Sequence, residues 1–333
     1  MSITIKDVAR KSGVCIATVS KVINGSTSIS EATRQRILET IEELHYTPNY
    51  RASSLAKKSL KRVLYLFQAL PNEAFQTPHT FNLLQGLLSG LSEKGYGLSV
   101  INSEDLADPA STIEQAINEK AYDGVVAHAS AINKNLLAYL ESCSFPILAV
   151  GQQKRINWVD TNHVLAGEKA AHFLWERGYR RFAFIGRPND DQVSALRLQG
   201  IRNELADHGI VLDDSCVKSI DPSPLEIEEA TKELWAMKDK RDVIIAEDNV
   251  IAYTVSTALN RLGALVPKQI SYLTFDRYPY SDILNPKATS VDINVTQLGK
   301  EAAKLIVNII EQPSLRIQSF VTVPAIVVGE STH

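Results

Sequence analysis

The sequence holds few cysteines and lacks the short motifs that mark common enzyme families. Cys15, Cys143 and Cys216 are odd in number, far apart and without a CxxC pair, so we expect reduced thiols rather than a disulfide framework or a cysteine zinc site. The motifs GxSxG, GxxxxGK[ST] and HExxH do not occur, and Gly95-Tyr96-Gly97 lacks the third glycine of a dinucleotide fingerprint. We therefore expect no enzyme activity, no bound metal ion and no cofactor.

Long apolar runs are also missing. No stretch has the length and apolar content of a membrane span, and the amino terminus does not follow the pattern of a signal peptide. We therefore expect a cytoplasmic protein with no membrane partner. At 333 residues the chain is too long for one ordinary core, so two or three domains are expected.

Charge is spread unevenly along the chain. The net charge is −3, yet residues 1–61 hold ten Lys and Arg against five Asp and Glu, which leaves 25 against 33 for the remainder. A basic head therefore precedes an acidic body. This asymmetry confines the attraction for nucleic-acid phosphates to the head.

Residues 4–24 have the pattern of a helix-turn-helix. Apolar residues Ile5 and Val8 recur at helical spacing, and Gly13 ends the first expected helix. Apolar residues of the second helix share the face toward the first: Val19, Val22 and Ile23. The side chains left facing outward are mostly short: Ile16, Ala17, Ser20 and Lys21. A generic pair of helices with a glycine turn is the alternative interpretation.

Short residues at the start of the second helix let its backbone approach base edges in a major groove. There Thr18, Ser20 and Asn24 can bond phosphates, and Lys21 can reach a base or a phosphate. Ser30 is a good N-cap for a third helix, which Pro48 ends by excluding helical geometry at Thr47.

From Lys61 onward short apolar strands alternate with amphipathic helices. Strands are expected at 62–67, 97–101, 124–127 and 146–150, and the pattern then restarts at 181–185, 217–220, 242–246, 270–274, 291–293 and 320–328. Helices are expected at 81–94, 109–119, 135–142, 166–178, 194–209, 225–237, 250–262 and 298–310. The alternation predicts two consecutive α/β units with parallel, doubly wound sheets.

The order of residues in the head carries a more specific signal. Thr-Ile-Lys-Asp-Val-Ala-Arg-Lys-Ser-Gly-Val at 4–14 and Ala-Thr-Val-Ser-Lys-Val-Ile-Asn at 17–24 resemble the DNA-binding head of the lactose and galactose repressor family. Tyr46-Thr-Pro-Asn49 with Ala52, Leu55 and Ala56 resembles that family's hinge. The resemblance runs through essentially the whole chain and implies a helix-turn-helix domain at 1–47, a hinge helix and linker at 48–60 and an effector-binding and dimerisation domain at 61–333.

The family's body has two lobes like those of periplasmic sugar-binding proteins, and its chain crosses between them three times. The resemblance implies a first lobe of about 61–158 and 292–318 and a second of about 161–288 and 320–333, so the helix near 298–310 returns to the first lobe. No heptad stretch follows Val328, which favours a homodimer over a tetramer. Two heads related by a two-fold axis imply a pseudo-palindromic operator in double-stranded DNA.

The family's hinge helix enters the minor groove, where Leu55 is expected to wedge between base pairs. A flexible linker over 49–58 is the alternative. Counting head and hinge together, the residues expected to contact DNA are Thr4, Ile16, Ala17, Thr18, Ser20, Lys21, Asn24, Ser30, Asn49, Ala52 and Leu55.

A small-molecule effector is expected between the lobes, beyond the carboxyl ends of the strands. Arg197 matches a family arginine that binds effector hydroxyls, and Asp276 in Thr274-Phe-Asp-Arg matches the family's effector-binding aspartate. These two types suit a sugar, because arginine offers a fork of donors and a carboxylate accepts from adjacent hydroxyls. An Arg and an Asp that merely pair with each other are the alternative. The expected effector residues are Phe75, His128, Trp158, Arg197, Glu247 and Asp276.

The chain departs from many relatives at Glu247-Asp248, where they have Asn-Asp, and at Thr274, where they have Gly. The extra carboxylate disfavours an anionic effector. Residues 290–294 resemble maltose-system regulators more than lactose ones. We therefore expect a repressor of a carbohydrate-utilisation operon that a neutral sugar releases. A regulator with a purine-type corepressor and a soluble sugar-binding protein without a DNA role are the alternatives.

Overall fold

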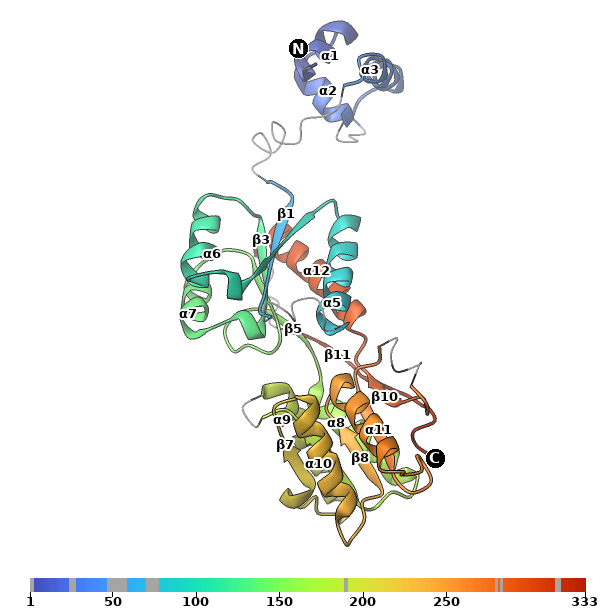
Figure 1. Cartoon of the computed structure of the whole chain (residues 1–333). Helices are drawn as coiled ribbons and strands as arrows, with labels where there is room; N and C mark the ends of the chain where they lie inside the picture. The colour runs from blue at the N-terminus through green and yellow to red at the C-terminus, as the bar shows by residue number, and fades with distance from the viewer. Residues whose placement is uncertain are drawn as a thin grey trace. The chain divides into compact units, whose positions relative to one another are not determined.

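The chain divides into two units, Met1–Lys61 and Arg62–His333, here called the head and the body. The computed structural model describes residues 3–23, 28–46, 59–69, 78–188, 191–278, 281, 284–314 and 319–333. Figure 1 shows the helices of the head and the α/β lobes of the body. Along the described residues no helix is both long enough and apolar enough to span a bilayer.

The described residues of the head form three helices: α1 (Ile5–Ser12), α2 (Ile16–Ile23) and α3 (Glu31–Glu43). Gly13 ends α1 in the left-handed region at φ +68°, where a side chain would be strained. Val8, Val19 and Ile37 contribute one fully buried side chain from each helix. The helix-turn-helix expected from the sequence is therefore confirmed.

The described residues of the body form two sheets. The first has the order β11-β5-β4-β3-β1-β2 with parallel neighbours throughout. Its strands are β1 (Arg62–Phe67), β2 (Gly97–Asn102), β3 (Gly124–His128), β4 (Ile147–Val150), β5 (Trp158–Thr161) and β11 (Ser319–Thr322). Its helices are α5 (Pro78–Glu93), α6 (Pro109–Asn118), α7 (Lys134–Ser142) and α12 (Val295–Glu311).

Alternation along β1 shows how this sheet is covered. Val63 and Tyr65 pack in the cluster of α5 and α12, whereas Leu64 and Leu66 pack in the cluster of α6 and α7. Successive side chains of a strand point to opposite faces. A strand buried on both faces therefore reads as a continuous apolar run, as the sequence of β1 does.

The second sheet has the order β12-β10-β9-β8-β6-β7, in which only β12 runs antiparallel to its neighbour among the described strands. Its strands are β6 (Phe182–Gly186), β7 (Val217–Ser219), β8 (Val243–Ala246), β9 (Ser271–Phe275), β10 (Thr289–Asp292) and β12 (Ala325–Val327). Its helices are α8 (His163–Glu176), α9 (Gln192–Asp207), α10 (Pro224–Ala236) and α11 (Asn249–Arg261). The doubly wound α/β architecture of the body is confirmed.

The chain passes between the two sheets after β5, after β10 and between β11 and β12. The helix expected to return to the first lobe is α12, whose buried residues share a cluster with β1 and α5. The expected strand at 320–328 is wrong as a single element, because it forms β11 in the first sheet and β12 in the second. Pro324 separates them, since proline lacks the N–H that a continuous strand would use.

Short 3-10 turns complete the described elements at Ser103–Asp105, Ala129–Ala131 and Asp214–Cys216. The strand β5 was not expected. It has only four residues, and its sequence Trp-Val-Asp-Thr carries a charge in the middle. The crossing from the first sheet to the second at 323–324 also lies a few residues later than the lobe boundary expected near 318–320.

Candidate functional sites

The outer face of α2 is the candidate DNA-reading surface. Ile16 is 43% exposed, and Ala17 and Lys21 are also exposed, whereas Thr18 and Ser20 are half-buried. The Thr18 hydroxyl lies 3.2 Å from the Cys15 sulfur, a contact that lowers the pKa of the Cys15 thiol. Small side chains at the start of α2 thus leave its backbone accessible to a groove.

The ends of α1 and α3 carry two further predicted contacts. Thr4 is exposed, and its backbone N–H and its hydroxyl both donate to Asp7 Oδ2, at 3.0 and 2.7 Å. These bonds lower the pKa of Asp7. Ser30 is the N-cap of α3, but its hydroxyl bonds the Thr33 hydroxyl at 2.9 Å instead of a backbone N–H. Both side chains lie at the surface, where a phosphate can replace these local bonds.

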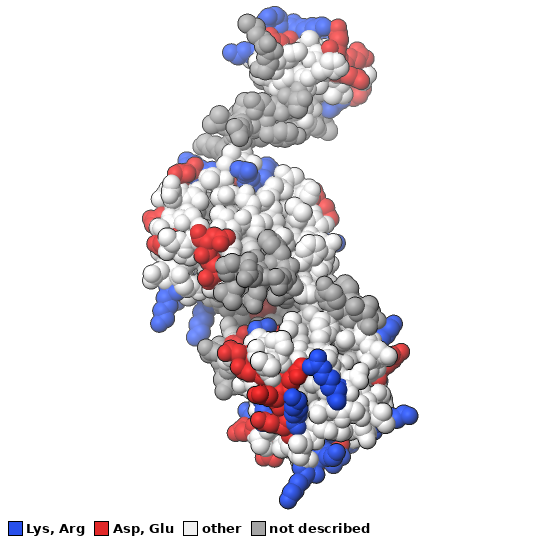
Figure 2. Space-filling view, in the orientation of Figure 1, with Lys and Arg blue, Asp and Glu red and all other residues white. Residues whose placement is uncertain are grey.

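Figure 2 shows Lys and Arg along the upper edge of the head and Asp and Glu gathered over α3. The acidic groups of α3 include Glu31, Glu39 and Glu43, so negative charge lies on a different helix from the candidate reading face. Four predicted DNA contacts lie outside the described residues: Asn24, Asn49, Ala52 and Leu55.

The candidate effector site of the body centres on Arg197 of α9, which is 2% exposed. Its Nη2 donates to Asp276 Oδ1 at 3.0 Å, and its Nη1 donates to the Glu247 carbonyl at 2.5 Å. The guanidinium lies over the Phe275 ring, 4.6 Å from the centroid. Burial by itself would lower the pKa of Arg197, but the negative charge of Asp276 beside it outweighs burial and raises this pKa. Arg197 is therefore a buried, fixed cation.

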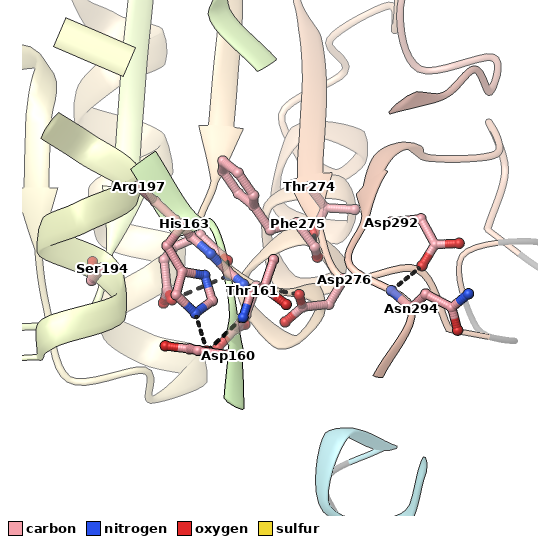
Figure 3. Close-up of polar contacts among 12 residues, drawn as sticks. Asp160, Thr161, His163, Ser194, Arg197, Thr274, Phe275, Asp276, Asp292 and Asn294 are labelled. Atoms are coloured by element: carbon pink, nitrogen blue, oxygen red, sulfur yellow. Dashed lines mark hydrogen bonds and ion pairs between the residues drawn. The ribbon is translucent and has the colours of Figure 1, made fainter. Parts of the chain in front are cut away.

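Asp276 follows β9 and adopts φ +65°, which is uncommon for a residue other than glycine. Its backbone N–H donates to the Val291 carbonyl of β10 at 2.9 Å, which holds the strained turn in place. Figure 3 shows its carboxylate directed at the Arg197 guanidinium. Strain of this kind is concentrated at ligand-binding positions, where the surrounding structure maintains it.

Two acidic residues after β8 extend the site. Arg187 Nη2 donates to Asp248 Oδ2 at 2.8 Å, and Asp248 Oδ1 also caps α11 by accepting from the Ile251 N–H at 2.9 Å. Glu247 is 3% exposed. Burial raises the pKa of Glu247 to about 8, with Arg197 acting in the opposite direction and Asp248 adding to the rise. At neutral pH this carboxyl is mostly protonated and can donate a hydrogen bond.

Three atoms at this site have no hydrogen-bond partner within the described part of the chain: Arg197 Nε, Glu247 Oε2 and Tyr278 Oη. Glu247 Oε2 lies 3.6 Å from Arg187 Nε, an ion-pair distance too long for a hydrogen bond. Burying polar groups without partners is costly, so native proteins satisfy nearly all of them. The donors and acceptors left over here are those that a polar ligand can satisfy.

The crossing after β5 adds a second set of polar groups. Asp160 Oδ1 lies 3.2 Å from His163 Nε2, as drawn in Figure 3. Both residues line a cavity of about 130 Å³ together with Trp158, whose side chain shares a face of β5 with Asp160. The predicted aromatic Trp158 is therefore placed beside hydrogen-bonding groups.

The first lobe contributes His128 at the end of β3. Its Nδ1 lies 2.8 Å from the Ser130 hydroxyl, and its ring meets His79 of α5 edge to face at 5.9 Å. Burial lowers the pKa of each histidine to about 4, and the positive charge of Arg197 contributes to the shift of His79. Both imidazoles are therefore neutral at physiological pH. Ser130 also lines a cavity of about 190 Å³ with Gln68 and Glu104.

The structure brings Arg197, Glu247 and Asp276 together. It places His128 at the end of β3 and Trp158 at the start of β5, and Phe75 lies outside the described residues. No motif in the sequence pointed to His79, Asp160 or His163. The polar run Asp160-Thr161-Asn162-His163 was a usable signal, because a polar run after an apolar stretch is typical of a strand end. Pro78 at the first turn of α5 was the signal for an earlier helix start, beside His79.

Comparison with known proteins agrees with this architecture. Residues 4–49 match the family "Bacterial regulatory proteins, lacI family", and residues 171–332 match "Periplasmic binding protein-like domain". The HTH-type transcriptional regulator MalR of Streptococcus pneumoniae is 30% identical over 320 residues, covering 93% of each chain. The repressor PurR of Aliivibrio salmonicida is 24% identical and covers 99% of each chain.

Among solved structures, a complex of the transcriptional regulator CelR with cellobiose superposes with a TM-score of 0.73 at 26% identity, covering 99% of each chain. Both MalR and CelR are thus transcriptional regulators by name, and each is similar to this chain over more than nine-tenths of its length. The chain belongs to the lacI family of bacterial regulatory proteins.

Proposed function

We propose that this protein is a homodimeric, sequence-specific DNA-binding repressor of a carbohydrate-utilisation operon, and that a neutral sugar bound beside Arg197 and Asp276 releases it from its operator. The observation that carries the proposal is the buried Arg197–Asp276 pair with unused hydrogen-bonding atoms around it. A cytoplasmic location and the absence of catalysis accompany this role.

A sugar fits the chemistry of the site. Asp276 uses one carboxylate oxygen on Arg197, and its second oxygen can accept from a hydroxyl. Arg197 Nε and Tyr278 Oη supply further hydrogen-bonding groups, and Trp158 offers an apolar face for a pyranose ring. The relative solved with cellobiose supports a glucose disaccharide as the first ligand to test.

The charge of the site disfavours an anionic effector. Asp248 and Asp276 are buried carboxylates, and the two cations close to them, Arg187 and Arg197, already pair with them. With Glu247 protonated these charges balance, so an added phosphate would bring unbalanced negative charge into a buried site without an uncommitted cation among the groups described there. A neutral polyol avoids this cost.

Release would follow from a ligand that contacts both lobes and favours one arrangement of them. Arg197 and Asp276 belong to the second lobe, whereas His79 and His128 belong to the first. A ligand seated between these groups would bias lobe closure. In a dimer that change alters the spacing of the two heads and therefore their fit to a palindrome.

The test uses the full-length protein and DNA duplexes selected from a random pool. Selected duplexes should converge on a pseudo-palindrome, and binding should weaken steeply with salt because Lys and Arg displace counterions from phosphates. Mono- and disaccharides, sugar phosphates and purine bases are then screened by thermal shift, and each ligand that stabilises the protein is titrated into the protein–duplex complex. Release by a neutral sugar supports the proposal.

Two outcomes contradict it in different ways. A purine base that strengthens DNA binding would assign the chain to a corepressor mechanism. Stabilisation by a sugar without any selected duplex would leave a sugar-binding protein and remove the DNA role. Sugar phosphates serve as the matched control for the charge argument.

A further inference from the structure

Two histidines and one glutamate meet on the surface of the second lobe, away from the residues assigned to the effector. His172 lies in α8, Glu204 lies in α9, and His208 caps the end of α9. Glu204 Oε1 lies 2.7 Å from His172 Nδ1 and 3.0 Å from His208 Nε2. One ligand atom from each residue falls within 4.8 Å of the other two. We propose that His172, Glu204 and His208 bind a divalent transition metal ion of the zinc type.

The packing of α8 on α9 explains why these side chains meet. The helices touch through their backbones at Gly167 and Gly200, where an added Cβ would lie 2.1 Å from the Arg197 carbonyl and 2.0 Å from the Val164 carbonyl. Glu204 and His208 follow Gly200 at steps of four residues, so all three share the face of α9 toward α8. The close approach therefore directs the cluster across a narrow gap.

The distances suit a small ion with little rearrangement. Zinc binds imidazole nitrogen and carboxylate oxygen at roughly 2.0–2.2 Å in tetrahedral geometry, which sets neighbouring ligand atoms about 3.3 Å apart. The two contacts of Glu204 are roughly 0.6 and 0.3 Å shorter than that, and no two of the three ligand atoms lie more than 4.8 Å apart. Two imidazoles and one carboxylate form a ligand set known for zinc, with water completing the coordination.

Two neighbouring groups lie against the imidazole rings of the cluster. Glu176 Oε1 lies 3.5 Å from His172 Nε2, the ring nitrogen that faces away from Glu204. A carboxylate on the distal nitrogen of a ligand histidine fixes the ring and raises its basicity. The His208 ring stacks on Trp175 with centroids 3.6 Å apart and planes 6° from parallel. Both imidazoles are therefore held before any ion arrives.

The sequence carried no motif for this site, and the expectation of no metal rested on that absence. The only close spacing is Glu204 to His208, because His172 comes from another helix 32 residues earlier. Helix packing assembles the third ligand. A pattern search over single segments therefore misses it.

The alternative is a hydrogen-bonded cluster in which Glu204 simply links two imidazoles. The side chains of His172, Glu204 and His208 are 51%, 18% and 21% exposed, so water can solvate them. The two interpretations differ in whether saturable metal binding occurs. They also differ in the effect of Glu176, which a plain cluster around Glu204 does not need.

The test uses tag-free, chelator-treated full-length protein titrated with zinc chloride by calorimetry, and with nickel chloride by tryptophan fluorescence, since Trp175 contacts His208. One saturable site per chain is expected, with magnesium failing to compete because hard cations prefer oxygen ligands. Acidification should weaken binding, since protons compete for imidazole. Trp175→Phe should abolish the fluorescence change on nickel binding, whereas the heat of zinc binding should still be measured by calorimetry.

Variants assign the site. His172→Gln and Glu204→Gln should each lower the affinity for zinc by about tenfold or more, and Glu176→Gln should lower it by on the order of tenfold. His45→Gln, which removes an exposed imidazole from the head, should leave affinity unchanged. Wild-type protein without a saturable site, or cluster variants that bind like wild type, overturns the proposal. If a cluster variant fails to fold, the wild-type titration and the surface variant Glu176→Gln still decide whether the site binds zinc.

Discussion

Arg197 and Asp276 form a buried ion pair, Nη2 to Oδ1 3.0 Å, across 79 residues of sequence and between a helix and a strand end. Each side chain is at most 10% exposed. Such a pair contributes little net stability, because desolvation offsets the attraction, whereas removing one partner leaves a buried charge and is costly. Its value in a binding site lies in fixing a donor fork and an acceptor in one orientation.

Asp276→Asn should lower the affinity for the effector sugar roughly ten- to a hundredfold. This is the equivalent of about 1.5–3 kcal/mol for the loss of a charged hydrogen-bonding partner. The variant should bind operator but resist release at sugar concentrations that free the wild type. Calorimetry with the sugar and fluorescence anisotropy with the operator measure the two properties. Asp242→Asn is the control, because Asp242 pairs with Arg181 at the opposite end of β8. Equal sugar responses in both variants would contradict the assignment.

The protonation of Glu247 predicts how stability depends on pH. An ordinary glutamate has a pKa of 4.5, whereas burial raises that of Glu247 to about 8. Between these values the folded chain keeps a proton that the unfolded chain has released, so the contribution of Glu247 to stability falls as pH rises and levels off above the folded pKa. Glu247→Gln should reduce this fall. Urea unfolding at about pH 5 and about pH 9 measures it.

Glu233→Gln is the control for the pH experiment, since Glu233 pairs with Lys218 and is 65% exposed. It should keep the pH dependence of the wild type. An unchanged pH dependence in Glu247→Gln would place the titrating carboxyl elsewhere.

Lys21→Ala should weaken operator binding. If Lys21 reads a base, preference should relax at one symmetric pair of positions by about 1–3 kcal/mol. Uniform weakening over all single-base variants would assign Lys21 to phosphate. Lys11→Ala is a matched control in the head, because Lys11 pairs with Glu43 of α3 at 2.6 Å. Anisotropy against a panel of duplexes separates the cases.

Much of the fold could be predicted from local pattern. Continuous apolar runs located β1 and β8, and Gly13 located the end of α1, because these features depend on neighbours in sequence. The pattern failed where tertiary partners decide the structure. β5 is held by strands on both sides although its own four residues carry a weak signal, and β11 and β12 join different sheets although they are three residues apart.

The site was harder to predict than the fold. Resemblance identified Arg197 and Asp276, and the structure adds that they contact each other. The protonation of Glu247 depends on burial, which no motif encodes. His79 lies at the start of α5, and His163 lies at the start of α8, just after the crossing. Their place near the site becomes visible only when the distant strand ends are assembled.

Gly167→Ala tests whether helix packing positions the effector arginine. An added Cβ would lie 2.1 Å from the Arg197 carbonyl, a distance that forces α9 to move. Overpacking of this kind costs about 1–3 kcal/mol, more than the ~1 kcal/mol that alanine gains over glycine in a helix. The variant should therefore lose stability and also bind the sugar more weakly, because the displaced backbone carries Arg197 away from Asp276.

Gly86→Ala is the matched control for this experiment. Its added Cβ would lie 2.1 Å from the Thr296 carbonyl, so it produces the same kind of clash between α5 and α12 in the first lobe. Urea unfolding should show a comparable loss of stability in both variants, whereas calorimetry should show reduced sugar affinity chiefly in Gly167→Ala. Equal sugar affinity in the two variants at matched stability would mean that the packing of α8 on α9 does not position Arg197.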